Sequence, residues 1–262
     1  MKSLLRYINI WWLMSKNSFV SVFYSKLSLT LFLIAKTLRF LFFFVFIFFL
    51  LKGTNSLAGY NLNQTVFFFL TFNLVDITAQ FLYREVYRFR PQVISGGLDL
   101  TLTKPISPLF RSLMGGADVI DLITIPPLIY AIFYVGRMLN PSLLHATYYL
   151  LLIVNGLLIA TAFHIAVLGL GIITLEIDHT IMIYRDVTNL GRFPVDIYKQ
   201  PLQGILTFLV PVGIMITLPA KALMGLVSPI GVFSSFLVGV AAVFLSIQFW
   251  NFALTKYTSA SS

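Results

Sequence analysis

The sequence has no cysteine, and only 10% of its 262 residues are charged. Without cysteine there is no disulfide framework, no thiolate metal site and no thiol chemistry. Acidic residues are scarce, nine against 18 lysines and arginines, so the formal net charge is +9. The basic residues are scattered among apolar stretches and form no continuous basic surface. We therefore expect no nucleic acid partner.

Motifs of several enzyme classes are also missing. The chain has no G-x-x-x-x-G-K-[ST] phosphate loop, no H-E-x-x-H zinc motif and no G-x-S-x-G nucleophile motif. Its histidines, His145, His164 and His179, fall in three different segments. The sequence thus predicts no catalytic residue, no metal site and no cofactor bound by this chain, although short polar motifs of intramembrane enzymes would escape such a search.

Apolar residues, in contrast, make up 58% of the chain, and the mean hydropathy is +0.91. A helix needs roughly 20 mostly apolar residues to cross a hydrocarbon core of ~30 Å. Six stretches satisfy this condition, at about 28–51, 62–82, 113–136, 147–173, 202–219 and 228–254. Because lipid offers no partner for backbone groups, each is expected to be a helix. The predicted fold is all-α, a polytopic membrane protein with one six-span domain over residues 28–262.

Residues 1–27 precede the first span and have a different composition. Basic and polar residues alternate there with aromatic ones such as Trp11, Trp12 and Tyr24. Aromatic anchors among cations are typical of a helix that lies in the membrane surface. We expect an amino-terminal interfacial helix, with a disordered basic tail as the alternative. No A-x-A-like cleavage site follows, so no signal peptide is expected.

The distribution of lysine and arginine predicts the orientation. With the amino terminus inside, the inner segments 1–27, 83–112, 174–201 and 255–262 carry 13 of the 18 basic residues. The outer loops carry three, and Lys36 and Arg39 lie within the first span. Because cytoplasmic loops are enriched in these residues, we expect both ends of the chain in the cytoplasm and a multi-pass protein of the plasma membrane.

The inner segment 83–112 has the composition of a structured loop. It combines a basic stretch, a Gly96-Gly97 turn, an apolar repeat at Leu98, Leu100 and Leu102, and prolines. We expect another protein to dock on it.

This loop resembles a segment of the six-helix ABC-2 type permeases, "R-x-G-E-L-D-x-x-L-x-[KR]-P-[VI]-S-P-L-F". The matching residues are Gly96, Leu98-Asp99, Leu102, Lys104-Pro105 and Ser107-Pro108-Leu109-Phe110. Ile94 and Gly97 depart from the pattern, where relatives commonly carry Arg and Glu. Further elements of the same family are matched in order by Phe193–Tyr198, Leu206–Val212, Leu218–Ala220 and Lys256–Ala260. The resemblance covers nearly the whole chain.

The resemblance implies a function and partners. Members of that family are membrane subunits of ATP-binding-cassette exporters, which work as dimers with two separate ATPase subunits. ATP and magnesium would then bind to the partner subunits, and this chain would need an identical or homologous second permease. It also implies an ATPase-coupling helix in the 83–112 loop, for which the residues to test are Arg84, Glu85, Arg88, Arg90, Leu98, Asp99, Lys104 and Pro105. As an alternative, the cations of this loop serve only to orient the chain.

Ionisable residues inside the predicted spans form a second group. On a rise of ~1.5 Å per residue, Lys36, Arg39, Asp76, Asp118 and Asp121 fall in one layer, the inner third of the membrane. A buried charge needs a partner, so we hypothesise that Lys36 and Arg39 pair with Asp76, or also with Asp118 or Asp121. Snorkelling of the two long side chains to the surface is the alternative, and contact with the substrate is a further one.

Two other functions remain open at this point. A secondary transporter would couple its substrate to an ion through carboxylates in the membrane and would show inverted repeats, of which we find none. A purely structural membrane subunit would have the same composition and spans. The sequence does not select a substrate.

Overall fold

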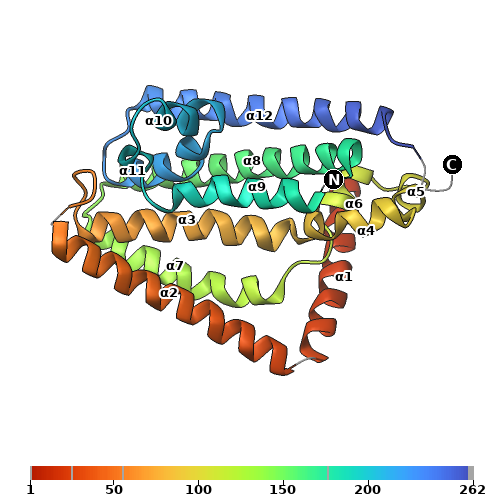
Figure 1. Cartoon of the computed structure of the whole chain (residues 1–262), viewed down its shortest axis with the longest axis horizontal. Helices are drawn as coiled ribbons and strands as arrows, with labels where there is room; N and C mark the ends of the chain where they lie inside the picture. Colours follow the sequence, from red (N-terminus) through yellow and green to blue (C-terminus); the bar gives the residue numbers. More distant parts are fainter. Residues whose placement is uncertain (1, 25, 55, 176, 259–262) are drawn as a thin grey trace.

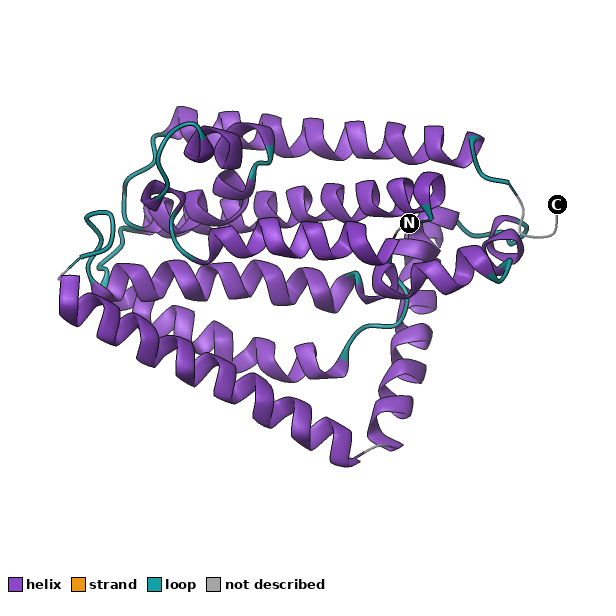
Figure 2. Ribbon diagram, in the orientation of Figure 1, coloured by secondary structure: helices purple, strands orange, loops and turns teal. Residues whose placement is uncertain are grey.

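The apolar runs form long helices, because a helix satisfies its backbone groups without help from water. The computed structural model describes residues 2–24, 26–54, 56–175 and 177–258. Within these ranges the secondary structure is helical and has no strand (Figure 2). The chain is an all-α polytopic membrane protein, as the sequence predicts.

Five helices are long and apolar enough to cross a membrane. They are α2 Lys26–Thr54, α3 Leu62–Leu82, α7 Val119–Met138, α8 Leu143–Thr174 and α12 Pro229–Thr255. Figure 1 shows α3, α7, α8 and α12 along the length of the molecule, whereas α2 runs obliquely and its start diverges from them toward α1. The third predicted span starts too early, at 113, because the segment around Gly115 and Gly116 is not helical and Asp118 caps α7.

The fifth predicted span, 202–219, is wrong as a single straight helix. The chain forms α10 Leu202–Gly204, η4 Ile205–Leu209, η5 Gly213–Thr217 and α11 Leu218–Leu223, with an angle of 75° between the two arms. Pro211, which has no N–H to donate, lies at the bend. Asp196 precedes this segment, and its carboxylate lies 2.7 Å from Lys221 Nζ in the second arm. The segment therefore returns to the end from which it came, as a re-entrant hairpin.

A further crossing is made by part of the segment predicted as an inner loop, 174–201. It contains α9 Ile177–Asn189, η2 Leu190–Arg192 and η3 Val195–Ile197, and α9 lies along α8 (Figure 1). At one end Asp178 pairs with Arg90, just after α3, at 3.3 Å. At the other end Asp196 accepts a hydrogen bond from the Tyr60 hydroxyl, just before α3, at 3.0 Å. Because Arg90 and Tyr60 flank α3, this segment runs the length of the bundle.

Six crossings therefore remain in the described part of the chain, with α9 in place of 202–219. The end that carries α1, the 84–113 loop and the last described residues is called the inner end here, after the predicted orientation. Inner segments 1–27, 83–112 and 255–262 carry 10 lysines and arginines, and the outer connections carry four, Lys52, Arg137, Lys199 and Lys221. This split still favours the predicted orientation.

The amino-terminal segment forms one helix, α1 Lys2–Tyr24, which runs at a steep angle to the long helices (Figure 1). The Tyr7 hydroxyl accepts a hydrogen bond from Ser107 N at 3.1 Å, and Ser15 Oγ accepts one from Ala117 N at 3.2 Å. Trp12 is exposed on α1, with several leucines. A crosswise helix with exposed apolar side chains suits the membrane surface, and its interfacial position stays a prediction.

The centre of the bundle is aromatic and closely packed. Phe67, Phe68, Phe69 and Phe72 of α3 are all buried, and Phe43 of α2 stacks on Phe69 with a centroid distance of 3.9 Å. The hairpin lies against α8 where Gly156 leaves room, since a Cβ there would be 2.4 Å from the Met215 carbonyl oxygen. Small residues allow such close approach of backbones in membrane proteins.

Candidate functional site

The loop at the inner end of α3 folds into four short helices. They are η1 Arg84–Arg88, α4 Phe89–Ile94, α5 Gly97–Leu102 and α6 Pro108–Leu113. Gly96 turns the chain between α4 and α5 with φ of +73°, a value that favours glycine. Ser107 Oγ caps α6 by accepting a hydrogen bond from Phe110 N. Val86, Phe89 and Leu98 are fully buried and attach the loop to the bundle.

Glu85 is the polar centre of this loop and is 94% buried, with 6% of its surface exposed. Its carboxylate accepts hydrogen bonds from Gln92 Nε2 at 2.7 Å and from Arg111 Nη1 at 2.8 Å. A Cβ at Gly115 would lie 2.3 Å from this carboxylate, so the chain passes directly against it. Because buried carboxylates need such partners, Glu85 connects η1, α4 and α6 into one unit.

Helices α4 and α5 and the residues next to them carry exposed side chains that are apolar or basic. Ile94 and Leu100 are 55% and 66% exposed. We call this group the coupling surface, and define it as Arg88, Arg90, Ile94, Leu100, Leu102, Lys104 and Pro105, all exposed. Apolar side chains fixed on a rigid support, with cations around them, suit the docking of another protein.

The remaining predicted residues of the loop have structural contacts. Arg84 Nε lies 3.2 Å from Asp118 Oδ2, and its guanidinium lies 5.4 Å from the centre of the Tyr87 ring. Burial raises the pKa of Tyr87 to about 12. Asp99 lies beside the Tyr257 hydroxyl, and burial together with this carboxylate raises the pKa of that hydroxyl. Pro105 also contributes its carbonyl oxygen, which accepts a hydrogen bond from Arg6 at 2.9 Å.

The predicted layer of charges is assembled differently from the hypothesis. Lys36 forms an ion pair with Asp121, and both side chains are largely buried. Asp76 accepts a hydrogen bond from Gln80 Nε2 at 2.8 Å and makes no ion pair with Lys36. Asp118 lies outside the helical span, because its side chain caps α7 by accepting a hydrogen bond from Ile120 N. Of the alternatives in the hypothesis, the pair Lys36–Asp121 is the one that the structure contains.

Arg39 differs from Lys36. It is exposed on α2, and it has no ion pair within the described residues. The Asp76 carboxylate attracts Arg39 electrostatically, and it also attracts Arg185 and Arg192. Arg39 and Asp76 therefore interact electrostatically without a direct salt bridge.

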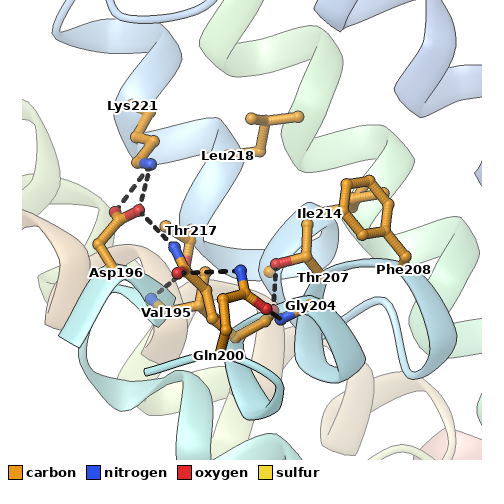
Figure 3. A pocket seen from close by; sticks show the side chains of 12 residues that line it. Val195, Asp196, Gln200, Gly204, Thr207, Phe208, Ile214, Thr217, Leu218 and Lys221 are labelled. Carbon is orange, nitrogen blue, oxygen red and sulfur yellow. Dashed lines mark hydrogen bonds and ion pairs between the residues drawn. The ribbon is translucent and has the colours of Figure 1, made fainter. Parts of the chain in front are cut away.

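A pocket of about 210 Å³ lies at the outer end, between η3 and the hairpin (Figure 3). Its polar wall consists of Asp196, Gln200, Gln203, Thr207, Thr217 and Lys221. Asp196 accepts hydrogen bonds from Lys221 at 2.8 Å and from Gln203 at 3.4 Å. Thr217 Oγ1 accepts one from Val195 N at 3.2 Å. Burial, followed by the Asp196 charge, raises the pKa of Tyr60. These bonds hold the hairpin against the end of the α9 crossing.

A comparison with known protein families identifies the family of this chain. The sequence model of ABC-2 family transporter proteins matches residues 14–261, which is nearly the whole chain. The chain belongs to the ABC-2 transporter family. Neither the curated proteins nor the solved structures gave a match. As an ABC-2 family protein it is a multi-pass membrane protein of a transporter.

Two motifs that suggested the ABC-2 family come together in the structure. Asp99 belongs to the loop motif and Tyr257 to the terminal motif, and the two residues lie side by side although 157 residues of chain separate them. Ser259 and Ala260 of the terminal motif lie outside the described residues.

Sequence reasoning missed two arginines of this ABC-2 protein, Arg185 and Arg192, because it placed them in a cytoplasmic loop. The signal that could have identified their helix is its one-sided pattern. Ile177, Ile181 and Thr188 are buried at near-helical spacing, while Asp178, His179 and Asp186 lie among the exposed residues. A low mean hydropathy concealed this crossing from a search for continuous apolar runs.

Proposed function

We propose that this chain is the membrane-spanning permease subunit of an ABC exporter, and that separate ATPase subunits drive it through the coupling surface. The observation that supports this proposal is the surface itself. Exposed Ile94 lies on α4, which the buried Glu85 binds through Gln92. Exposed Leu100 lies on α5, which the buried Leu98 attaches to the bundle. ATP and magnesium would bind to the ATPase subunits, where hydrolysis takes place.

Contacts behind the coupling surface offer a route for mechanical coupling. Glu85 links α4 to α6 through Gln92 and Arg111. Arg84, at the inner end of α3, pairs with Asp118 at the start of α7. A displacement of α4 and α5 would thus move the ends of two spans together, because packed and hydrogen-bonded elements transmit strain.

A second permease, identical or homologous, would complete the pathway. Asp186 is exposed near the middle of the α9 crossing, and Arg39 is exposed on α2. Charges do not face lipid at that depth, and they commonly face a water-filled cavity or another subunit. This supports a pathway between two permease subunits in the plasma membrane, the inner membrane of a bacterium.

Copurification with the ATPase tests the coupling proposal. Leu100→Asp should reduce recovery of the ATPase about tenfold or more, because a carboxylate replaces a central apolar contact. Leu226→Asp is the matched control, since Leu226 is also exposed but lies at the outer end between α11 and α12. Equal recovery with both variants would reject the coupling surface. Transport by the purified chain without ATPase would favour a secondary transporter, and absence of any ATPase would favour a structural subunit.

A further inference from the structure

Three arginines from two crossings meet near one carboxylate in the inner half of the bundle. Arg39 comes from α2, and Arg185 and Arg192 come from the α9 crossing. All three attract Asp76 of α3 electrostatically. Within the described residues, none of them makes an ion pair with a carboxylate. The carboxylates of this region are Asp76 and Asp186, the residue that follows Arg185.

Aromatic contacts give the positions of two of these arginines, Arg185 and Arg192. The Arg185 guanidinium lies 6.0 Å from the centre of the Tyr87 ring, at the inner end of α3. The Arg192 guanidinium lies 5.7 Å from the Phe72 ring, one turn of α3 further outward than Asp76. Arg192 approaches Asp76 from the outer side and Arg185 from the inner side. Arg192 Nε is buried without a hydrogen-bond partner among the described residues.

The position of Arg39 follows from its neighbours on α2. Arg39, Phe43 and Phe46 share one face of the helix, at spacings of four and seven residues. The rings of Phe43 and Phe46 lie 5.5 Å and 6.4 Å from that of Phe193, which follows Arg192 directly. This face of α2 therefore turns toward η2, and Arg39 lies on its inner part. Phe46 remains 51% exposed beside the cluster.

Two other cations of this layer are already neutralised. Lys36 is paired with Asp121, and Arg84 is paired with Asp118. Asp76 is the charge at the centre of the three arginines, and it accepts its hydrogen bond from the neutral Gln80. Three arginines against the carboxylates of Asp76 and Asp186 leave an excess of one positive charge, which is expensive at this depth unless an anion joins it.

We propose that Arg39, Arg185 and Arg192 bind the anionic head group of a transported amphiphile, of phosphate or carboxylate type. Its apolar chain lies against the exposed aromatic face of α2 that includes Phe46. Guanidinium groups suit this ligand, because their planar donors bind phosphate and carboxylate oxygens in pairs. The inference rests on the proposed permease function and names the substrate class of that pathway.

Binding of a defined amphiphile tests the proposal. The permease with its ATPase is placed in nanodiscs of phosphatidylcholine, and binding of radiolabelled dodecyl phosphate is measured. Arg39→Gln, Arg185→Gln and Arg192→Gln should each weaken binding about tenfold, since each removes charge-assisted hydrogen bonds. Arg137→Gln should leave it unchanged, because Arg137 is an exposed cation at the outer end of α7.

Asp76→Asn should change ligand binding in the opposite direction to the arginine substitutions. If Asp76 competes with the ligand for the arginines, its neutralisation should tighten binding several-fold. Arg→Lys variants at the three positions keep the charge if the Gln variants fail to fold, and they should bind more weakly than the native protein because the paired donors are lost.

Three results would overturn the proposal. These are binding that does not depend on the three arginines, equal binding of a zwitterionic dodecylphosphocholine probe, and equal binding of inorganic phosphate, which would indicate a site for a free anion. Copurification of the ATPase is measured on the same samples. Retained ATPase without arginine-dependent binding rejects this inference alone, whereas loss of the ATPase from the native chain rejects the proposed function.

Discussion

Asp196 and Lys221 form an ion pair of 2.7 Å, although residues 197–220 lie between them. A straight helix of that length would extend roughly 36 Å, enough to place the two residues on opposite sides of a membrane. The contact therefore requires that the intervening segment turn back. It makes the apolar run 202–219 a hairpin, and it leaves α9 as the crossing that precedes it.

Labelling of single cysteines tests this topology directly, because the native chain has no cysteine. Lys199→Cys should react with a membrane-impermeant maleimide on intact cells, since Lys199 is exposed beside the outer pocket. Leu226→Cys should react in the same way, and Lys104→Cys should react only after the membrane is permeabilised. If Lys199→Cys reacted only after permeabilisation, as expected for Lys104→Cys, Lys199 would lie inside. Residues 202–219 would then be a straight span that crosses the membrane.

The ion pair itself should contribute to stability. Asp196→Asn and Lys221→Met are combined in a double-mutant cycle, with thermal unfolding of the purified protein as the measurement. We expect a coupling energy of about 1 kcal/mol, because the two groups are in direct contact and only partly exposed. Lys199→Met serves as the control for loss of a cation at this end. Additive effects of the two substitutions would contradict a stabilising ion pair between Asp196 and Lys221.

Substitution of Lys36 or Asp121 should lower thermal stability more than substitution of Asp196 or Lys221, because Lys36 and Asp121 are largely buried at membrane depth. Lys36→Met or Asp121→Asn alone leaves the other charge unpaired, which typically costs about 3 kcal/mol. Lys36→Met with Asp121→Asn should recover most of the loss in thermal stability, since neither charge then remains. A double variant as unstable as the sum of the single ones would argue against the pairing.

How far the sequence predicts this protein depends on the kind of contact. Spans such as α3 and α12 follow from composition, because lipid selects long apolar helices whatever their neighbours. The α9 crossing does not, since Arg185 and Asp186 make it polar and contacts with other crossings hold it in place. Its identification requires the tertiary structure.

The candidate site shows the same division. The motif of the 83–112 loop predicts its place in the sequence, and Gly96-Gly97 predicts its turn. The sequence does not predict the ion-pair partner of Lys36, because counting residues gives the depth of a side chain but not the helix that it faces. Lys36 faces Asp121 of α7, whereas Arg39, three residues later, lies on the side of Asp76.

The approach of the hairpin to α8 gives a last prediction. A Cβ at Gly156 would lie 2.4 Å from the Met215 carbonyl oxygen, which is backbone and has no rotamer to change. Gly156→Ala should therefore displace the hairpin and lower thermal stability, by about 2 kcal/mol as for other overpacked sites. Gly53→Ala is the matched control, because Gly53 is also helical and a Cβ there meets nothing within 4 Å.

Replacement of a helical glycine by alanine should then have opposite effects on thermal stability at Gly156 and Gly53. Gly53→Ala removes backbone entropy from the unfolded chain and should leave stability equal or higher by up to ~1 kcal/mol. Thermal unfolding of both variants, with maleimide labelling of Lys199→Cys in each background, separates a local shift from a general loss of the fold. Equal stability of Gly156→Ala and Gly53→Ala would show that the hairpin does not contact α8 closely at Gly156.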